Sequence, residues 1–309
     1  MNDLNQKIVK MAIDSGFIGI GFSLPARPLF FDQFTSWISA GKNAGMSWLG
    51  RNINLREDPS LMLEGCRTVI SLAYPYSSGR ILTTDGLMVS RYSSPDKDDY
   101  HLRVKRLCKE IVNLFKQNDG SCSARICIDS APVLERSMAY AAGIGFIGKN
   151  NMLIIPGSGS YFYLAEIFTS MALEIPAVRR MENQCGSCTR CIEACPMAAL
   201  ETPFAIDASR CLSYLTIEYK GQVGSMEGRR MGNCFLGCDR CQEACPFNSI
   251  EKSNEILLPS SNEILEMQNE EFIRKFGRTA LKRAGLEKIK GNINAIRTSG
   301  VRNDRERWV

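Results

Sequence analysis

The stretch Cys185-Gly-Ser-Cys188-Thr-Arg-Cys191-Ile-Glu-Ala-Cys195-Pro196 decides what this 309-residue chain can be. Its spacing, C-x2-C-x2-C-x3-C-P, lets three cysteines wrap one face of an inorganic cluster within a tight loop, while the fourth follows one helical turn later and points away. Thiolate sulfur is the soft ligand that iron–sulfur clusters prefer. The spacing therefore predicts iron–sulfur ligation and argues against zinc, whose sites seldom use this four-cysteine run with a trailing proline.

A second, incomplete copy of the run follows at Cys238-Asp-Arg-Cys241-Gln-Glu-Ala-Cys245-Pro246. Phe235 stands where its first cysteine should be, so either Cys211 or Cys234 supplies the missing ligand. Cys234 is one residue out of register, which favours Cys211. In ferredoxins with two clusters, the fourth cysteine of each run serves the other cluster. We therefore predict two [4Fe–4S] clusters that form an electron relay, one bound by Cys185, Cys188, Cys191 and Cys245, and the other by Cys195, Cys211, Cys238 and Cys241.

The other cysteines and the N-terminus place the chain in a reducing compartment. Nine of the 13 cysteines fall within residues 185–245. No basic and apolar leader precedes Asp3, so we expect a cytoplasmic protein in which crowded cysteines bind metal and do not form disulfides. No apolar run reaches the length of a membrane helix, so no membrane partner is expected. The outlying cysteines show no ligand spacing and are predicted to be structural thiols: Cys66, Cys108, Cys122 and Cys127.

Hydrophobic periodicity predicts an α+β fold with an N-terminal α/β or α+β part. Helices are expected at 4–15, 32–42, 99–116, 132–142 and within 262–297, strands at 17–22, 68–73 and 125–129, and a hairpin of 151–155 with 161–169. The predicted domains are 1–178 as a catalytic α/β domain, 179–254 as a ferredoxin-like domain for two clusters, and 255–309 as a basic helical segment.

A glycine-rich stretch, Gly143-Ile-Gly-Phe-Ile-Gly148-Lys149-Asn150, resembles two nucleotide-binding patterns. Both patterns require a strand before the glycines, whereas a helix is predicted here, and Asn150 replaces the Ser or Thr of a P-loop. A loop that lies close against another large ligand is the better interpretation.

Charge is uneven along the chain. The net charge is only +5, but residues 274–309 hold eleven Lys or Arg against three Asp or Glu. This end either binds a nucleic-acid phosphate backbone or forms a solvated helical face.

Several segments together resemble the epoxyqueuosine reductase family over residues 15–297. They are Asp129-Ser-Ala-Pro-Val-Leu-Glu-Arg136, 143–151, Ser160-Tyr-Phe-Tyr-Leu-Ala-Glu166, Cys211-Leu-Ser-Tyr-Leu-Thr-Ile-Glu218 and Gly232-Asn-Cys-Phe-Leu-Gly-Cys238. The resemblance implies a cobalamin-binding domain like that of reductive dehalogenases, reduction of epoxyqueuosine to queuosine at the tRNA wobble position, and an external ferredoxin or flavodoxin donor. It also implies that Asp129 is the proton donor, since an epoxide oxygen leaves poorly as an alkoxide; from the residues alone, a helix N-cap is the alternative.

The resemblance also implies the remaining site residues. Cobalamin contacts are expected at Tyr92, Asp129, Lys149, Asn150, Ser160, Ser213 and Tyr214. The single histidine, His101, is expected on the surface or behind the site and not on cobalt. The basic segment 272–280 matches a family helix, so Lys275, Arg278, Lys282 and Arg283 are expected to contact tRNA.

Two departures and two alternatives accompany this interpretation. Many family members continue with a longer helical region where this chain stops at Val309, and Cys234 stands where the family usually has arginine. A corrinoid reductive dehalogenase shares the core but usually carries a twin-arginine export signal, absent here. A non-catalytic iron–sulfur electron carrier would not need about 175 residues before its cysteines. A monomer is expected.

Overall fold

The computed structural model describes residues 3–95, 98–177, 179–248 and 255–300. Two compact units divide the chain: the first contains residues 1–76 and 100–188, and the second contains 77–99 and 189–309. Residues 77–99 thus leave the first unit and pack with the second, unlike the continuous segment 1–178 expected from sequence. The assignment of functions to the three expected segments stays a prediction.

The first unit is built on a four-stranded sheet in the order β1-β2-β8-β5. These strands are Gly19–Ser23, Thr68–Pro75, Phe162–Thr169 and Ala124–Cys127. Every neighbouring pair is antiparallel. Because α/β folds need parallel strands, this unit is α+β, and the expectation of an α/β domain was wrong.

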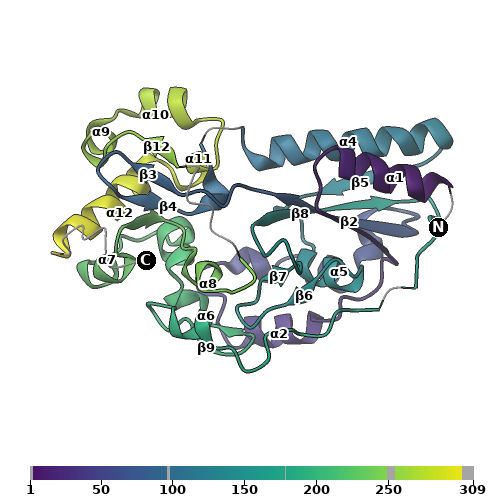
Figure 1. Cartoon of the computed structure of the whole chain (residues 1–309), viewed down its shortest axis with the longest axis horizontal. Coiled ribbons are helices and arrows are strands. Elements are labelled where there is room, and N and C mark those ends of the chain that lie inside the picture. The colour runs from purple at the N-terminus through teal and green to yellow at the C-terminus, as the bar shows by residue number, and fades with distance from the viewer. Residues whose placement is uncertain (1–2, 96–97, 178, 249–254, 301–309) are drawn as a thin grey trace. The chain divides into compact units, whose positions relative to one another are not determined.

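Helices cover both faces of this sheet (Figure 1). α1 (Asp3–Asp14) and α4 (Tyr100–Asn118) lie on one face, and α5 (Glu135–Ala141) lies on the other. Alternate residues of β8 serve the two faces: Phe162, Leu164 and Phe168 pack with the cores that contain α5, whereas Tyr163 stacks on Tyr100 of α4. The unit also contains α2 (Phe31–Ser39), α3 (Ile53–Glu57) and the 3-10 helices Ser47–Gly50 and Pro59–Met62. The helices and strands expected up to residue 142 are confirmed within a few residues at their ends.

The expected hairpin of 151–155 with 161–169 is wrong. β7 (Leu153–Ile154) pairs instead with β6 (Phe146–Ile147), and only one isolated bridge, Ile155 to Gly159, spans the Pro156 turn. Strand β8 is unavailable because β2 and β5 occupy both of its edges. The glycine-rich stretch builds the new hairpin: a Cβ on Gly145 would lie 2.3 Å from the carbonyl oxygen of Ile154. The close approach expected for a ligand is therefore made by the chain's own backbone.

The second unit holds a sheet in the order β11-β4-β3-β12. Its strands are Cys234–Leu236, Met88–Val89, Ile81–Thr83 and Ile256–Leu258. A β9–β10 pair (Leu200–Thr202, Ala205–Ile206) lies outside it. The unit's helices are α6 (Arg190–Glu193), α7 (Ser225–Met231), α8 (Arg240–Glu243), α9 (Ser261–Glu266), α10 (Asn269–Phe276), α11 (Leu281–Ala284) and α12 (Leu286–Thr298). Shorter turns are the 3-10 helices Arg91–Ser93 and Ala208–Arg210 and the π-helix Tyr214–Glu218. The helices expected at 262–297 are confirmed.

Among the described residues, no helix is both long and apolar enough to cross a bilayer.

A buried ion pair attaches residues 77–99 to the second cysteine run. Arg91 is only 3% exposed, and its Nη1 donates to Asp239 Oδ2 at 3.1 Å and to Glu243 Oε1 at 2.7 Å. Its backbone N–H also donates to Asp239 at 2.8 Å, and its Nε donates to the Ser78 carbonyl. Burial raises the pKa of Asp239 to about 6, although the Arg91 charge opposes the shift. The segment is thus held where α8 presents its cysteines.

Replacing Arg91 by methionine should leave the buried Asp239 and the half-buried Glu243 without their partner. Removing one member of such a pair costs about 3–5 kcal/mol, so the amides of 88–89 and 234–236 should lose most of their protection from hydrogen exchange. Arg274→Met on the exposed face of α10 is the matched control and should leave this protection unchanged. Equal protection in the two variants would show that the pair does not hold the segment.

Candidate iron–sulfur and proton-donor sites

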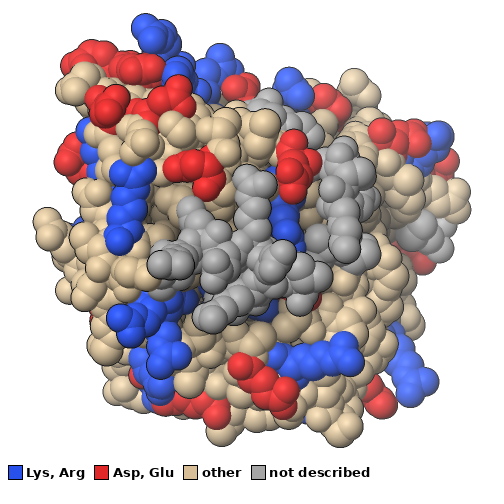
Figure 2. All heavy atoms as spheres, turned by 60° about the vertical axis from the view of Figure 1, so that its left-hand side comes forward, with Lys and Arg blue, Asp and Glu red and all other residues tan. Residues whose placement is uncertain are grey.

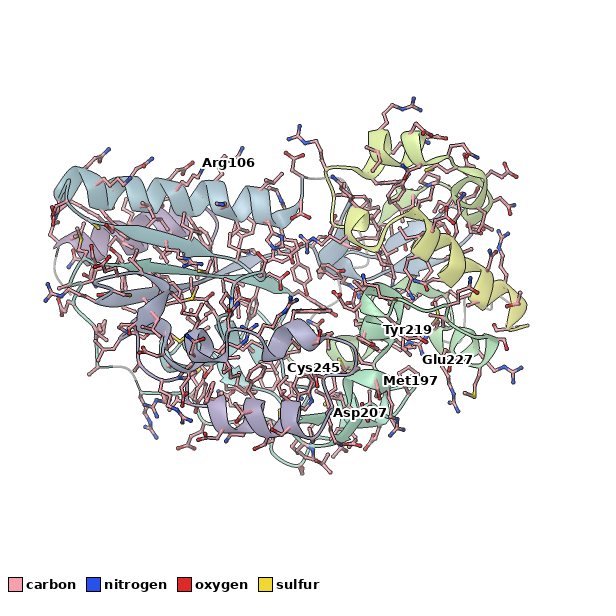
Figure 3. The ribbon with its side chains drawn as sticks, turned by 180° about the vertical axis from the view of Figure 1, so that it is seen from behind. Arg106, Met197, Asp207, Tyr219, Glu227 and Cys245 are labelled. Carbon is pink, nitrogen blue, oxygen red and sulfur yellow. The ribbon has the colours of Figure 1, made fainter. Side chains whose placement is uncertain are left out.

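The second half of the first cysteine run and the second run form matching turns within the second unit. Helix α6 has the sequence Arg-Cys-Ile-Glu, and α8 has the equivalent sequence Arg-Cys-Gln-Glu. The two helices pack against each other. Ala194 N–H donates to the Arg190 carbonyl at 2.9 Å, and Ala244 N–H donates to the Arg240 carbonyl at 3.0 Å. Each helix is followed by a cysteine and a proline, with Cys245 visible in Figure 3. The sequence repeat is therefore also a structural repeat.

Four cysteines of this unit influence one another's ionisation. Burial, followed by the charges of Cys238, Cys211, Asp239 and Cys195, raises the pKa of Cys241 well above its usual value. Burial also raises the pKa of Cys238 to about 12, with Cys211 among the further causes, and the pKa of Cys211 is raised by burial and by Cys195. Cys195, Cys211, Cys238 and Cys241 thus lie close together, as expected for one ligand set. The raised pKa values of Cys211, Cys238 and Cys241 favour protonated thiols in the absence of a cluster, and bound iron would favour the thiolates.

Cys234 does not share this position. Its Sγ lies 3.5 Å from each of the carbonyl oxygens of Leu236 and Gly237, and of the other cysteines only Cys238 influences its pKa, which burial raises. Cys234 is a buried residue of β11. This geometry agrees with the choice of Cys211 over Cys234, although the ligand assignment itself stays a prediction.

A buried polar network fixes the loop that carries Cys238. Thr216 Oγ1 accepts from Gly237 N–H at 2.9 Å and donates to the Leu212 carbonyl. Asn292 of α12 donates from Nδ2 to the carbonyls of Thr216 and Phe235, both at 2.9 Å. Thr216 and Asn292 are buried, at 0% and 1% exposure. The segments that carry Cys211 and Cys238 are therefore held to one helix, an arrangement that the spacing did not reveal.

The first cysteine loop is anchored within the first unit. Lys149 Nζ donates to the carbonyls of Gly186 at 2.6 Å and Cys188 at 2.9 Å. Asn183 Nδ2 donates to the Ile147 carbonyl at 2.5 Å, while its Oδ1 accepts from Cys185 N–H at 2.9 Å. Lys149, expected at cobalamin, thus binds the backbone around Cys185 and Cys188. No group of three or more His, Cys, Asp or Glu among the described residues is arranged to hold a single metal ion.

Asp129 follows β5 in a left-handed backbone conformation, with φ of 54°. Non-glycine residues adopt this conformation rarely, and it is frequent at functional sites. Its backbone N–H donates to Glu135 Oε1 at 2.5 Å, and its side chain is 57% exposed. The helix begins only at Glu135, and no cap by Asp129 is present, so the N-cap alternative is wrong.

Two α4 residues hold the Asp129 carboxylate. Tyr100 Oη donates to Asp129 Oδ2 at 2.6 Å, and His101 Nε2 lies 3.6 Å from the same oxygen. Tyr100 is 7% exposed and stacks on Tyr163 of β8, with ring centroids 4.1 Å apart and an interplanar angle of 6°. His101 thus lies behind the carboxylate, as expected. Tyr100 was missed because its only sequence signal is its place at the start of an amphipathic helix.

The remaining expected cobalamin contacts lie in both units. Asn150 and Ser160 are buried in the first unit, and Asn150 Oδ1 accepts from Met152 N–H at 3.2 Å. Tyr92, Ser213 and Tyr214 are half-buried in the second unit. Amide and hydroxyl groups of this kind suit the amide side chains of a corrin, so the residue types fit the cofactor.

Three of the four expected tRNA contacts are paired with acidic residues. Lys275 lies 2.9 Å from Glu271, Arg278 lies 2.7 Å from Asp98, and Arg283 lies 2.7 Å from Asp99. On the face drawn in Figure 2, the Lys and Arg of the described residues are interspersed with Asp and Glu. Lys282 is exposed beside them. The basic end expected over residues 274–309 includes residues 301–309, which lie outside the described part of the chain.

A basic pocket of about 460 Å³ lies next to the first cysteine run in the second unit. Its lining residues are Pro196, Ser225, Met226, Arg229, Arg230 and Arg240. Arg240 precedes Cys241, and Pro196 follows Cys195. This pocket was not expected from the sequence, because α7 brings its arginines from about 30 residues further along the chain.

The cysteines of the two runs define an iron–sulfur protein of the double-cluster class. Residues 184–248 match the family model of a 4Fe-4S double cluster binding domain. Residues 56–130 match the family model for epoxyqueuosine reductase QueG. The chain is 35% identical over 306 residues to the epoxyqueuosine reductase of Cyclobacterium marinum, covering 94% of this chain and 96% of that one. It is 32% identical to that of Leadbetterella byssophila, over 96% and 99% of the two chains. The chain belongs to the epoxyqueuosine reductase family.

Solved structures of that family have the same fold. The Streptococcus thermophilus enzyme has a TM-score of 0.85 at 27% identity, covering 97% of this chain and 82% of that one. An epoxyqueuosine reductase bound to an epoxyqueuosine-modified tRNA-Tyr stem loop has a TM-score of 0.82 at 28% identity, over 96% and 81% of the two chains. A Bacillus subtilis structure, with a TM-score of 0.81 at 28% identity over 96% and 81% of the chains, has its catalytic aspartate loop swung out of the active site.

The choice between Cys211 and Cys234 can be tested by iron content. After anaerobic reconstitution the wild-type chain should hold about eight irons, the content of two [4Fe–4S] clusters. Cys211→Ala should lose one cluster and keep about four, whereas Cys234→Ala, the matched control, should keep both. The opposite pattern would make Cys234 the ligand.

Proposed function

We propose that this chain reduces the epoxide of epoxyqueuosine in tRNA to the alkene of queuosine. The observation that carries the proposal is the exposed Asp129 carboxylate, held by Tyr100 in a chain that belongs to this family over almost its whole length. This combination favours the reductase over a dehalogenase-like enzyme and over a carrier that only passes electrons. A tRNA substrate also places the protein in the cytoplasm.

The reaction requires both electrons and protons. Converting an epoxide to an alkene breaks two carbon–oxygen bonds, consumes two electrons and two protons, and releases water. Cobalamin, when bound, supplies two-electron reducing chemistry, and the iron–sulfur clusters supply electrons one at a time. We assign one cluster to Cys185, Cys188, Cys191 and Cys245 and the other to Cys195, Cys211, Cys238 and Cys241.

Each unit, taken by itself, contains polar side chains whose types suit cobalamin. Asn150 and Ser160 offer buried hydrogen-bonding groups in the first unit, and Tyr92, Ser213 and Tyr214 offer half-buried ones in the second. Lys149 holds the cysteine loop, so its role would be to fix the loop beside the cofactor.

Asp129 would deliver a proton to the departing oxygen. A carboxylic acid that is exposed at its tip yet fixed at its base can reach a substrate and return to the same position. Tyr100 fixes one carboxylate oxygen at 2.6 Å, and His101 Nε2 lies 3.6 Å from the same oxygen. The segment that contains Asp129 would move as the aspartate loop does in the Bacillus subtilis relative.

Asp129→Asn should remove the proton donor and preserve the shape of the side chain. Turnover of tRNA that bears epoxyqueuosine should fall about 10²–10⁴-fold, the range for losing a general acid. Iron content and cobalamin uptake should equal those of the wild type, and Asp119→Asn on the exposed turn after α4 is the control. Full turnover by Asp129→Asn would exclude the proposed role.

Basic residues of the C-terminal helices are proposed to contact the tRNA backbone. Lys282 is exposed, whereas Lys275, Arg278 and Arg283 must exchange acidic partners for phosphate. Phosphate contacts lower affinity as salt rises, so binding through these residues would depend strongly on ionic strength.

An acidic electron carrier of the ferredoxin or flavodoxin type is proposed to dock at the arginine pocket. Arg229 and Arg230 are exposed at its rim, and Arg240 directly precedes a proposed cluster ligand. A carrier bound there would have its redox centre near the proposed iron–sulfur clusters, and complementary charge would speed its association.

Reversing both exposed charges, as Arg229→Glu with Arg230→Glu, should raise the KM for an acidic flavodoxin about tenfold or more and reduce its salt dependence. The rate with dithionite, a small reductant that needs no docking surface, should stay unchanged, as should tRNA affinity. A matched double variant, Arg106→Glu with Lys109→Glu on α4, controls for net charge. Equal loss with both reductants would exclude a donor site here.

A further inference from the structure

The central strand of the first unit buries an acidic side chain for which no donor is present. Glu166 of β8 is 0% exposed, and no N–H or O–H group of another described residue donates a hydrogen bond to either of its carboxyl oxygens. In the sheet it lies opposite Ser71 of β2 and Cys127 of β5. An ionised carboxylate is strongly disfavoured in such surroundings, so the group keeps a proton instead.

Glu135, in the first turn of α5, brings a second carboxyl group to the same place. α5 packs on β8, and the two carboxyl groups lie within hydrogen-bonding reach of each other. Two ionised carboxylates have no proton to donate, whereas a single proton on the pair creates the bond and removes the repulsion. Burial, followed by the Asp129 charge, raises the pKa of Glu135 to about 8, and burial together with Glu135 raises that of Glu166 well above its usual value. The proton therefore belongs to the pair.

The other charged groups near Glu135 and Glu166 do not stabilise the two ionised carboxylates enough to remove the need for this proton. Arg136 of α5 favours ionisation of Glu135, but burial outweighs it. Burial keeps the thiols of Cys127 and Cys108 protonated, with pKa values of about 12. The titratable or charged neighbours on the elements packed against the pair are Arg136 on α5, Arg125 and Cys127 on β5, Cys108 on α4, and Asp129 with its partners Tyr100 and His101.

The pair is connected to the proton donor through the backbone. Glu135 Oε1 accepts the N–H of Asp129, the residue held in the left-handed conformation. A proton on the more deeply buried Glu166 can be donated to Glu135, whose Oε1 also accepts the Asp129 N–H. The acceptor that stabilises the left-handed turn is then itself held in place by Glu166.

We propose that protonated Glu166 is a positioning residue which, acting through Glu135, holds the Asp129 segment in place, and that loss of the shared proton at alkaline pH releases it. The proposal rests on the proposed role of Asp129 and adds its regulation. Because these acids bind their proton more tightly in the folded chain than the usual Glu pKa of 4.5 allows, the pair stabilises the fold less as pH rises toward about 8.

Glu166→Gln tests the proposal because its amide donates a hydrogen bond to Glu135 at every pH. At neutral pH this variant should turn over epoxyqueuosine tRNA within about twofold of wild type, and the alkaline decline of its pH–rate profile should move up by about one pH unit or more. Glu166→Leu, similar in volume but without a donor, should lose activity at all pH values. An alkaline limb that is the same in wild type and Glu166→Gln would overturn the proposal.

Two measurements on the resting protein separate this inference from the proposed function. Infrared spectra at pH 7 should show a protonated carboxyl band that is lost in Glu166→Gln and kept in Glu110→Gln, an exposed control on α4. The Asp129 amide should resist hydrogen exchange in wild type and Glu166→Gln but exchange rapidly in Glu166→Leu. If Asp129→Asn remained active while these results held, only the catalytic role would fail; if the band were absent in wild type, the shared proton would be excluded.

Discussion

Strand β8 supports Asp129, the proposed proton donor, from both faces of the sheet, and the first unit depends on this arrangement. Its Tyr163 lies beneath Tyr100, which holds the Asp129 carboxylate, while its Glu166 lies on the opposite face beside Glu135, which accepts the Asp129 N–H. Only a strand paired along both edges can fix its two faces at once, and β8 pairs with β2 over eight residues and with β5 over four. Strand β8 thereby helps to fix both the side chain and the backbone of Asp129, although Asp129 does not belong to that strand. The exposed residue thus has a rigid support, as precise positioning of a reactive group requires.

In the second unit the constraint is convergence of sulfur atoms from segments far apart in the chain. Cys211 follows a 3-10 turn, whereas Cys238 follows β11, and no local spacing brings them together. Thr216 and Asn292 do so by joining both segments to α12, and Arg91 fixes the N-cap residue of α8. These polar groups are buried and hydrogen-bonded, so they specify one arrangement of the loops more sharply than apolar contacts would. The basic helical segment thus has a structural role in holding the cysteines, beside any contact with tRNA.

The sequence was informative where the deciding interactions are local. The run 185–196 encodes its own turn, and α4 and β2 follow from periodicity over one element. It failed where the decision depends on competition between distant partners. The hairpin expected at the Pro156 turn was lost because β2 and β5 take both edges of β8, and Gly145 allows a tighter pairing upstream. The departure of residues 77–99 to the second unit depends on Arg91 meeting Asp239, 148 positions away, and Tyr100 gained its role only from its neighbours in space.

The acidic partners of the basic helices bear on how tRNA would be recognised. Arg278 and Arg283 are paired with Asp98 and Asp99, adjacent residues just before α4, and α4 begins with Tyr100 and His101. Exposed pairs of this kind contribute little stability, so phosphate groups can replace the carboxylates at small cost. Such an exchange would free two negative charges immediately before the residues that hold Asp129. Because the N-terminal end of a helix favours negative charge, the freed carboxylates would remain stable beside the start of α4 while the arginines bind phosphate.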